Sequence, residues 1–335
     1  MKRKIVSVIA LCVALVMVLS ACNIFGGGGK KIAVGPPASE TQSVSKLIFE
    51  AYGLKEGDYE KFQEAFGDAM DGLKDGNIDI SVGVLGLPAG SITDLQASAK
   101  DVKLLGLSDE AIKKIEEKSA YRKYIIPKDS YDFLKEDVQT VTAYAIMVVN
   151  TDTIDEELAY ELTKTMYEKA GENTHAQAKE MTLENALNGL EGLPIHPGSK
   201  RYFEEQGLKV DAEVAEVKAD AKERKKEFTL GTGSQGGTYY PLGGEIAGLW
   251  NKHIDGVNVT NTETGASLEN LKSIGDGAQD IGMTVHVPAH NALNGKAEFK
   301  KPVKNFAFIG HVYPEVIQIV TREATGINSL DDVTK

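Results

Sequence analysis

The stretch EFTLGTGSQGGTYYPLGGEIAGLWNKH, residues 227–253, predicts a strand that runs into a glycine-rich turn and then into a helix. Gly231, Gly233 and Gly236 stand at the spacing G-x-G-x-x-G between the two elements. Glycines in such a turn expose backbone N–H groups at the start of the helix, and these groups bind anions. Three interpretations remain open: a carboxylate site, a dinucleotide site in which Glu263 holds the ribose, and a purely structural turn.

Three further loops, TETGASLEN, GPPASETQ and GLPAGSITD, place hydroxyl groups between a predicted strand and a predicted helix. In open α/β sheets such loops gather at the carboxyl ends of the strands, where ligands bind. None of the four loops contains Arg or Lys, so helix N-termini and hydroxyls would hold a carboxylate. Each loop by itself is equally consistent with an ordinary helix cap. From the geometry of these loops alone we expect four residues at a ligand site: Pro37, Pro88, Thr264 and Thr284.

The order of the predicted elements is typical of an α/β protein with a mixed sheet flanked by helices. Strands and helices alternate before residue 137 and again after residue 227. Two long apolar segments, residues 138–150 and 312–322, interrupt this alternation. The charged stretch 208–227 has few large apolar side chains and predicts a linker.

The composition limits the possible functions. A chain of 335 residues is long enough for two domains with cores of their own. A formal net charge of -12 argues against nucleic acid as a partner, because phosphate binding needs clustered Lys and Arg.

The N-terminus has the features of an export signal. A positive start, Lys2 to Lys4, precedes the apolar run IVSVIALCVALVMVL, which ends in LSAC. This arrangement looks like a bacterial lipobox and predicts a lipoprotein signal peptide over residues 1–21 with a lipid on Cys22. Residues 22–30 then form a Gly-rich tether. The alternative is an uncleaved membrane anchor, for which the apolar run is short. We therefore expect an extracytoplasmic lipoprotein, in the periplasm or on the outer face of the cytoplasmic membrane.

Catalytic and metal-binding patterns are weak. His286 and His290 are four residues apart, but Pro288 lies between them and no H-E-x-x-H pattern is present. Ser43 and Lys46 match S-x-x-K without the motifs that accompany it in enzymes. The sequence predicts no enzyme, no metal and no cofactor.

Several long motifs resemble one family of transport receptors. GTGSQGGTYYPLGGEIAGLWNK, TETGASLENL and YPEVIQIVTR are similar to the first half of the TAXI-type solute receptors of TRAP transporters. KKIAVGPPASETQ, KDGNIDISVGV, DVQTVTAYAIMVVN and TLENALNGLEGLPIHPGSKRYF are similar to the second half. The resemblance covers nearly all of the chain beyond the signal peptide.

The resemblance implies a two-lobed fold of the periplasmic binding protein type and no catalysis. It implies a solute such as glutamate or 2-oxoglutarate, a small amino acid or dicarboxylate, which a monomeric receptor delivers to a TRAP membrane permease subunit. A sensor or adaptor of the same fold is the alternative. The site residues that the resemblance implies come from both lobes and the strand between them: Gly233, Ser234, Thr238, Tyr239, Ser267, Asn270, Tyr313, Ser39 and Thr41.

The two halves stand in the reverse of the family's order, which predicts a circular permutation. The charged linker, residues 208–227, would then join the family's own ends, and the hinge strands would be residues 138–150 and 312–322. Lobe B would comprise residues 31–137 and 323–335, and lobe A residues 151–207 and 228–311. Lys30 and Lys335 are expected to lie close together.

Overall fold

The computed structural model describes residues 29–37 and 39–334. The predicted signal peptide, the lipidation site Cys22 and most of the tether lie outside the described residues, as does Lys335. Among the described residues, no helix is long and apolar enough to cross a membrane.

One continuous mixed sheet runs through the molecule. Its strand order is β2-β1-β3-β10-β6-β9-β7-β8, with β4 also paired to β10 and β5 to β6. The predicted fold class, a mixed sheet flanked by helices, is confirmed. The strands are β1 (Lys31–Ala33), β2 (Glu60–Phe62), β3 (Ile80–Leu85), β4 (Val102–Leu104), β5 (Arg122–Ile126), β6 (Val138–Asn150), β7 (Glu227–Gly231), β8 (Asn258–Thr262), β9 (Ile281–Val285) and β10 (Phe306–Arg322).

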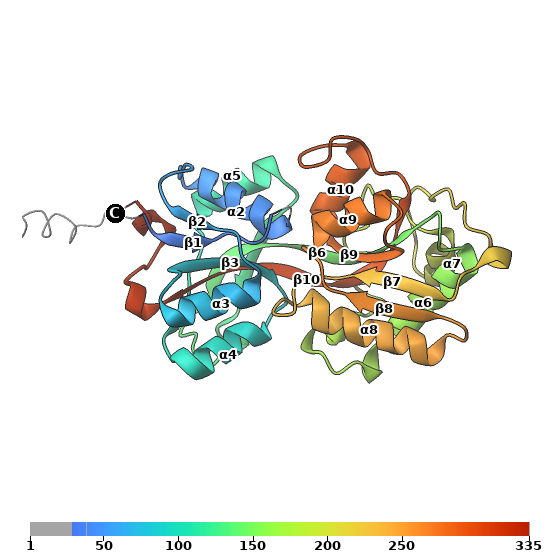
Figure 1. Ribbon diagram of the computed structural model, residues 1–335, viewed down its shortest axis with the longest axis horizontal. Helices are drawn as coiled ribbons and strands as arrows, with labels where there is room; N and C mark the ends of the chain where they lie inside the picture. Colours follow the sequence, from blue (N-terminus) through green and yellow to red (C-terminus); the bar gives the residue numbers. More distant parts are fainter. Residues whose placement is uncertain (1–28, 38, 335) are drawn as a thin grey trace, which may run out of the picture.

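The two longest strands, β6 and β10, pair antiparallel and connect the two halves of the sheet (Figure 1). β6 occupies the segment predicted as a hinge strand, whereas β10 begins earlier than expected, at Phe306. Two register shifts interrupt the pairing near its middle, between Phe308 and Gly310 and between His311 and Tyr313. Such irregularities bend a pair of strands locally.

The helices cover each half of the sheet on both faces (Figure 1). In the half that we call lobe B, α2 and α5 pack over one apolar cluster and α3 and α4 over another. The half that we call lobe A carries the remaining helices. The helices are α2 (Glu40–Ala51), α3 (Phe66–Asp75), α4 (Gly90–Ala99), α5 (Asp109–Lys118), α6 (Glu156–Glu168), α7 (Pro197–Glu205), α8 (Tyr239–His253), α9 (Ser267–Gly275) and α10 (His286–Asn294).

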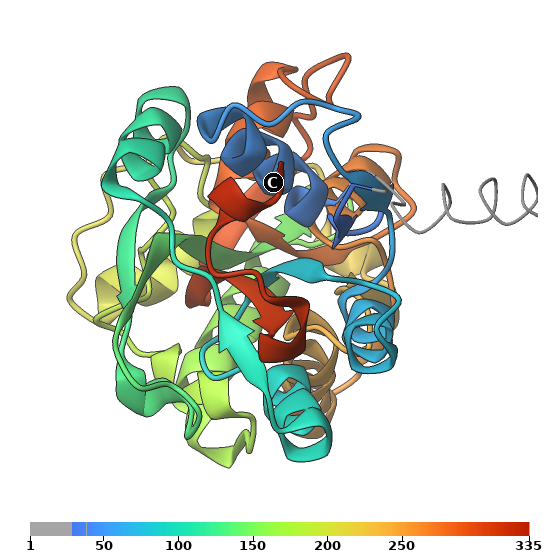
Figure 2. The same cartoon turned by 90° about the vertical axis from the view of Figure 1, so that its left-hand side faces the viewer.

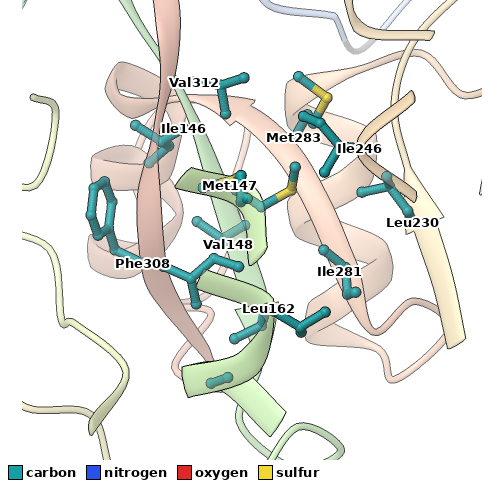
Figure 3. Packing of buried hydrophobic residues seen from close by; sticks show 14 of the residues in the cluster. Ile146, Met147, Val148, Leu162, Leu230, Ile246, Ile281, Met283, Phe308 and Val312 are labelled. Atoms are coloured by element: carbon teal, nitrogen blue, oxygen red, sulfur yellow. The ribbon is translucent and has the colours of Figure 1, made fainter. Parts of the chain in front are cut away.

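Lobe A has a core of its own, built on the apolar parts of β6 and β10. Met147 and Val148 of β6 lie between Phe308 of β10 and the side chains of β7, β9 and the surrounding helices (Figure 3). These residues are fully buried, and burial of one such side chain stabilises the fold by about 1.5–3 kcal/mol. Each lobe is therefore a packed unit, and the two long strands join them.

The segment predicted as a linker is bound along lobe A. Val214 forms a β-bridge with Ile195, and the N–H of Lys218 donates to the carbonyl of Thr151 at 2.9 Å. Both side-chain oxygens of Asp155, which caps the N-terminus of α6, accept hydrogen bonds from Arg224 at 2.6 and 2.7 Å. The linker thus crosses the surface of lobe A as a fixed strap.

The last described segment packs into the core of lobe B. Leu330 and Val333 belong to the same apolar cluster as Ile32 of β1 and Ile48 of α2. Figure 2 shows this segment, in red, beside the blue segment that starts the described chain. The first and last described elements therefore share one core.

The carboxyl ends of the parallel strands meet where the two lobes face each other. β1 and β3 are parallel in lobe B, and β9, β7 and β8 are parallel in lobe A. Helices α2, α8 and α9 begin shortly after the strands β1, β7 and β8 end. This edge of an α/β sheet is the usual position of a ligand site.

Candidate functional site

A small cavity lies between the two lobes at this edge. Its volume is about 70 Å³, well below the roughly 300–1,000 Å³ of pockets for drug-sized ligands, so a bound molecule must be small. Its lining comes from lobe B (Gly35, Pro36, Ser39, Glu40, Thr41, Glu64, Phe66, Ala69, Ser81, Val82, Val84, Leu85), from lobe A (Gly233, Ser234, Gly237, Thr238, Tyr239, Thr264, Gly265, Ala266, Ser267, Val285) and from β10 (Glu315).

Direct contacts hold the lobes together beside this cavity. The N–H of Gly86 in lobe B donates to Thr238 Oγ1 in lobe A at 2.9 Å. Gln177 Nε2 of lobe A donates to the carbonyl of Leu87 at 2.9 Å. Gly67 and Gly236 approach so closely that a Cβ atom on Gly236 would lie 2.5 Å from the Cα atom of Gly67. The two lobes are therefore in direct contact beside the cavity, and the structure is a closed arrangement of the lobes.

Three helices, α2, α8 and α9, direct their N-termini at the cavity, since residues of each first turn or cap line it. The first N–H groups of a helix lack intrahelical partners and carry positive partial charge, which favours an anion. Ala266, at the cap of α9, has φ 66° and ψ -145°, a conformation that only glycine adopts readily. Such backbone strain is common at ligand sites.

Eight of the predicted site residues line the cavity: Gly233, Ser234, Thr238, Tyr239, Thr264, Ser267, Ser39 and Thr41. Several of their hydroxyls already have partners in the protein. Ser39 caps α2 by accepting from the N–H of Gln42 and donates to the carbonyl of Pro36. Thr264 donates to Asn270 Oδ1 at 2.8 Å.

The other predicted residues lie outside the lining. Asn270 is fully buried and donates to the carbonyls of Gly231, Thr232 and Met283, so it supports the loops from behind. Thr284 donates to the carbonyl of Val285. Pro37 and Pro88 are also outside, the latter after a cis peptide bond from Leu87. Tyr313 contacts the site indirectly, through Glu315.

Three glutamates that the sequence interpretation missed line the cavity: Glu40, Glu64 and Glu315. A signal was present for Glu315, the only carboxylate in the 17-residue apolar strand FAFIGHVYPEVIQIVTR. Glu40 follows the Ser39 cap directly and resembles an ordinary first-turn acid of a helix, so its burial was not apparent. No Lys, Arg or His is among the described residues that line the cavity.

Glu315 is 1% exposed and lies among tyrosines. Its Oε1 accepts a hydrogen bond from Tyr313 at 2.9 Å, whereas Oε2 has no hydrogen-bond partner among the described residues. The hydroxyl of Tyr239 lies near this carboxylate without a well-aligned hydrogen bond. Burial raises the pKa of Glu315 to about 7, although the two tyrosine hydroxyls lower it.

Glu40 is 6% exposed, and its Oε1 accepts a hydrogen bond of 2.5 Å from Tyr121. Burial raises the pKa of Glu40 to about 7, and the nearby Glu315 adds to this effect. Ser81 Oγ, also buried and in the lining, has no partner among the described residues. Polar atoms buried without partners are rare in folded proteins, and here several belong to residues that line one cavity.

The alternative sites considered from the sequence receive less support. Glu263, the acid required for a dinucleotide site, binds Gln235 of the glycine-rich turn at 3.0 Å. The His286 ring accepts from the N–H of Tyr144 at 3.2 Å. No group of three or more His, Cys, Asp or Glu side chains that could hold a metal occurs in the part of the chain that the structure describes.

Fold and cavity together define a two-lobed protein with a small cavity between its lobes. The chain belongs to the NMT1-like family, which matches residues 21–207 and 230–335. The unmatched residues 208–229 nearly coincide with the strap on lobe A.

Among solved structures, a phosphate-binding protein of a phosphate ABC transporter from Streptococcus pneumoniae is 11% identical, with a TM-score of 0.38 over 90% of this chain and 92% of that one. The substrate-binding protein of an amino acid ABC transporter is 11% identical, with a TM-score of 0.39 over 91% and 90%. At these scores the likeness is only general, so the family rests on the sequence match.

Proposed function

We propose that this protein is a solute-binding receptor that closes its two lobes around a small carboxylate. The observation that carries the proposal is the cavity between the lobes, which both lobes line and on which three helix N-termini converge. Three of the residues that line it, Ser81, Tyr239 and Glu315, each have a buried polar atom without a partner among the described residues. These atoms would gain partners from a bound solute, which a purely structural contact between lobes would not provide.

The receptor would act outside the cytoplasm, tethered by a lipid on Cys22, and would deliver the solute to a TRAP-type membrane permease. Support for these steps comes from the lipobox-like LSAC sequence and from the resemblance of the loops to TAXI receptors. Glutamate and 2-oxoglutarate are the first solutes to test.

The chain would also be a circular permutant of that receptor type, with lobe boundaries as the sequence predicts. The shared core of Ile32, Leu330 and Val333 supports this proposal, because it brings the first and last described elements together.

A thermal melt in the presence of small carboxylates tests the binding function. A ligand that binds only the folded state raises its stability by about 2.7 kcal/mol at a hundredfold excess over Kd, and the melting temperature rises accordingly. We expect at least one amino acid or dicarboxylate to produce such a shift. A folded protein with no shift across both classes of compound would contradict the proposal.

A further inference from the structure

The charges around the cavity are unusual for a receptor of anions. The described lining holds three glutamates and no basic side chain. Two of them, Glu40 and Glu315, are close enough to raise each other's energy as charged groups, since Glu315 contributes to the raised pKa of Glu40. A solute with two negative charges would add to this repulsion.

Among the described residues of the lining, no basic side chain provides Glu315 with a counter-charge. It is 1% exposed, Tyr313 donates to its Oε1, and the Tyr239 hydroxyl lies near the carboxylate without a well-aligned hydrogen bond, so that Oε2 has no partner among the described residues. A buried carboxylate without a counter-charge is costly unless it takes up a proton or meets a cation. The carboxylate lines the cavity, so a cationic group of the solute can meet it there.

The helix N-termini at the same cavity prefer an anion, whereas Glu315 prefers a cation. α2, α8 and α9 have 12, 15 and 9 residues, and the first turn or cap of each lines the cavity. The N–H groups of a first helical turn favour a negative group, and in α2 Ser39 already accepts from one of them, that of Gln42. The cavity thus offers one region for an anion and one for a cation within a small volume.

From this juxtaposition, and resting on the proposed binding function, we propose that the solute carries an ammonium group that binds Glu315 while its carboxylate faces the helix N-termini. The solute class is then the α-amino acids, and 2-oxo acids and dicarboxylates without an amino group are poor ligands. Glu315 is the residue that determines this specificity.

Matched pairs of compounds test the proposal by calorimetry at pH 7.5. Each pair differs only in an amino or a keto group: glutamate and 2-oxoglutarate, alanine and pyruvate, leucine and 4-methyl-2-oxopentanoate. We expect the amino acid of a binding pair to bind at least about tenfold more tightly, the effect of one charge-assisted hydrogen bond. Equal or tighter binding of the 2-oxo acid would overturn the proposal and leave the receptor function intact.

The variant Glu315→Gln keeps the shape of the side chain and its contact with Tyr313 but removes the charge. We expect it to lose at least about tenfold in affinity for the amino acid and none for the 2-oxo acid. Glu117→Gln, an exposed glutamate on α5, is the matched control and should bind as the wild type does. An unchanged amino-acid preference in Glu315→Gln would overturn the proposal. The comparison of amino acids with 2-oxo acids on the wild-type protein tests the proposal even if the variant does not fold. A lack of binding by every compound would refute the proposed function itself.

Discussion

Thr238 Oγ1, at the start of α8, accepts a 2.9 Å hydrogen bond from the backbone N–H of Gly86, which follows β3 in the opposite lobe. Both residues are buried, and the bond crosses between the lobes beside the cavity. It can form only when the lobes are closed. Solute binding and this bond therefore favour the same conformation and should be coupled.

Removal of this acceptor should weaken solute binding. In Thr238→Val the buried N–H of Gly86 loses its partner only in the closed form, at a cost of about 1–2 kcal/mol, or roughly 5- to 30-fold in Kd. Calorimetry with the best solute measures the change. Thr238→Ser keeps the hydroxyl and should bind within a fewfold of wild type. If Thr238→Val and Thr238→Ser weakened solute binding equally, the loss of the hydroxyl could not explain the weaker binding.

Full closure of the lobes should require glycine at position 236, because Gly67 and Gly236 approach each other closely. A Cβ atom on Gly236 would lie 2.5 Å from the Cα atom of Gly67, so Gly236→Ala should prevent full closure and weaken binding at least about tenfold. The separate lobes should remain stable. Gly248→Ala, whose Cβ meets no atom within 4 Å, is the control and should leave binding unchanged. Small-angle scattering should show a more open form of Gly236→Ala in the presence of solute.

The two buried glutamates should make solute-free stability depend on pH. The pKa of Glu315 is about 7 in the folded protein, above the ordinary value of 4.5, so the folded state binds its proton more tightly than the unfolded state does. This group therefore lowers the free energy of unfolding increasingly as pH rises from about 4.5 through about 7. The ionisable groups around it are Glu40, Tyr121, Tyr239 and Tyr313, with Glu64 also in the lining.

Glu315→Gln removes this titration. The stability of the variant relative to wild type should increase between pH 5 and pH 8, by up to about 3 kcal/mol. Chemical denaturation across this range, without solute, measures the difference. A difference that stays constant with pH would show that Glu315 has an ordinary pKa.

The ion pair between Arg224 and Asp155 should stabilise the strap on lobe A. Burial raises the pKa of Asp155, but the hydrogen bonds from Arg224 outweigh this effect and the pKa lies below its usual value. A lowered carboxyl pKa contributes stability at neutral pH, and this contribution is lost as pH falls through the folded pKa. Arg224→Met should cost about 2 kcal/mol at pH 7 and less near pH 3. Lys222→Met, an exposed residue of the same segment, should cost little at either pH.

A rearranged chain tests the proposed permutation. Residues 30 and 334 would be joined by a short linker and new ends opened between residues 209 and 217, which keeps the Arg224 ion pair. Since Ile32 and Leu330 share one core, the joined chain should fold and bind the same solute. Loss of folding with linkers of several lengths would contradict the permutation.

Local patterns in the sequence were sufficient for much of the fold. The apolar segment 138–150 is the strand β6, and the glycine-rich turn at Gly233 does line the site, because strand periodicity and turn chemistry depend on neighbouring residues. The charge of the site was not predictable in this way. Glu40 and Glu315 are far apart in the sequence, and only the tertiary structure buries both at one cavity.

The contacts of the strap were also not predictable from local sequence patterns. Its high charge and few large apolar residues predict a solvated linker. In the structure Arg224 binds Asp155, and Val214 forms a β-bridge with Ile195. These contacts join distant segments and leave no periodic signal. Asn270 and Thr284, expected at the site from their loops or from the resemblance, instead direct their polar groups to backbone carbonyls.

Isothermal titration of the purified protein with a panel of amino acids and small carboxylates tests the central claim most directly. The cavity between the lobes predicts one site per chain with a Kd in the micromolar range or below, which corresponds to at least about 8 kcal/mol of binding free energy. The absence of any saturable heat from a protein shown to be folded would contradict the assignment as a solute receptor.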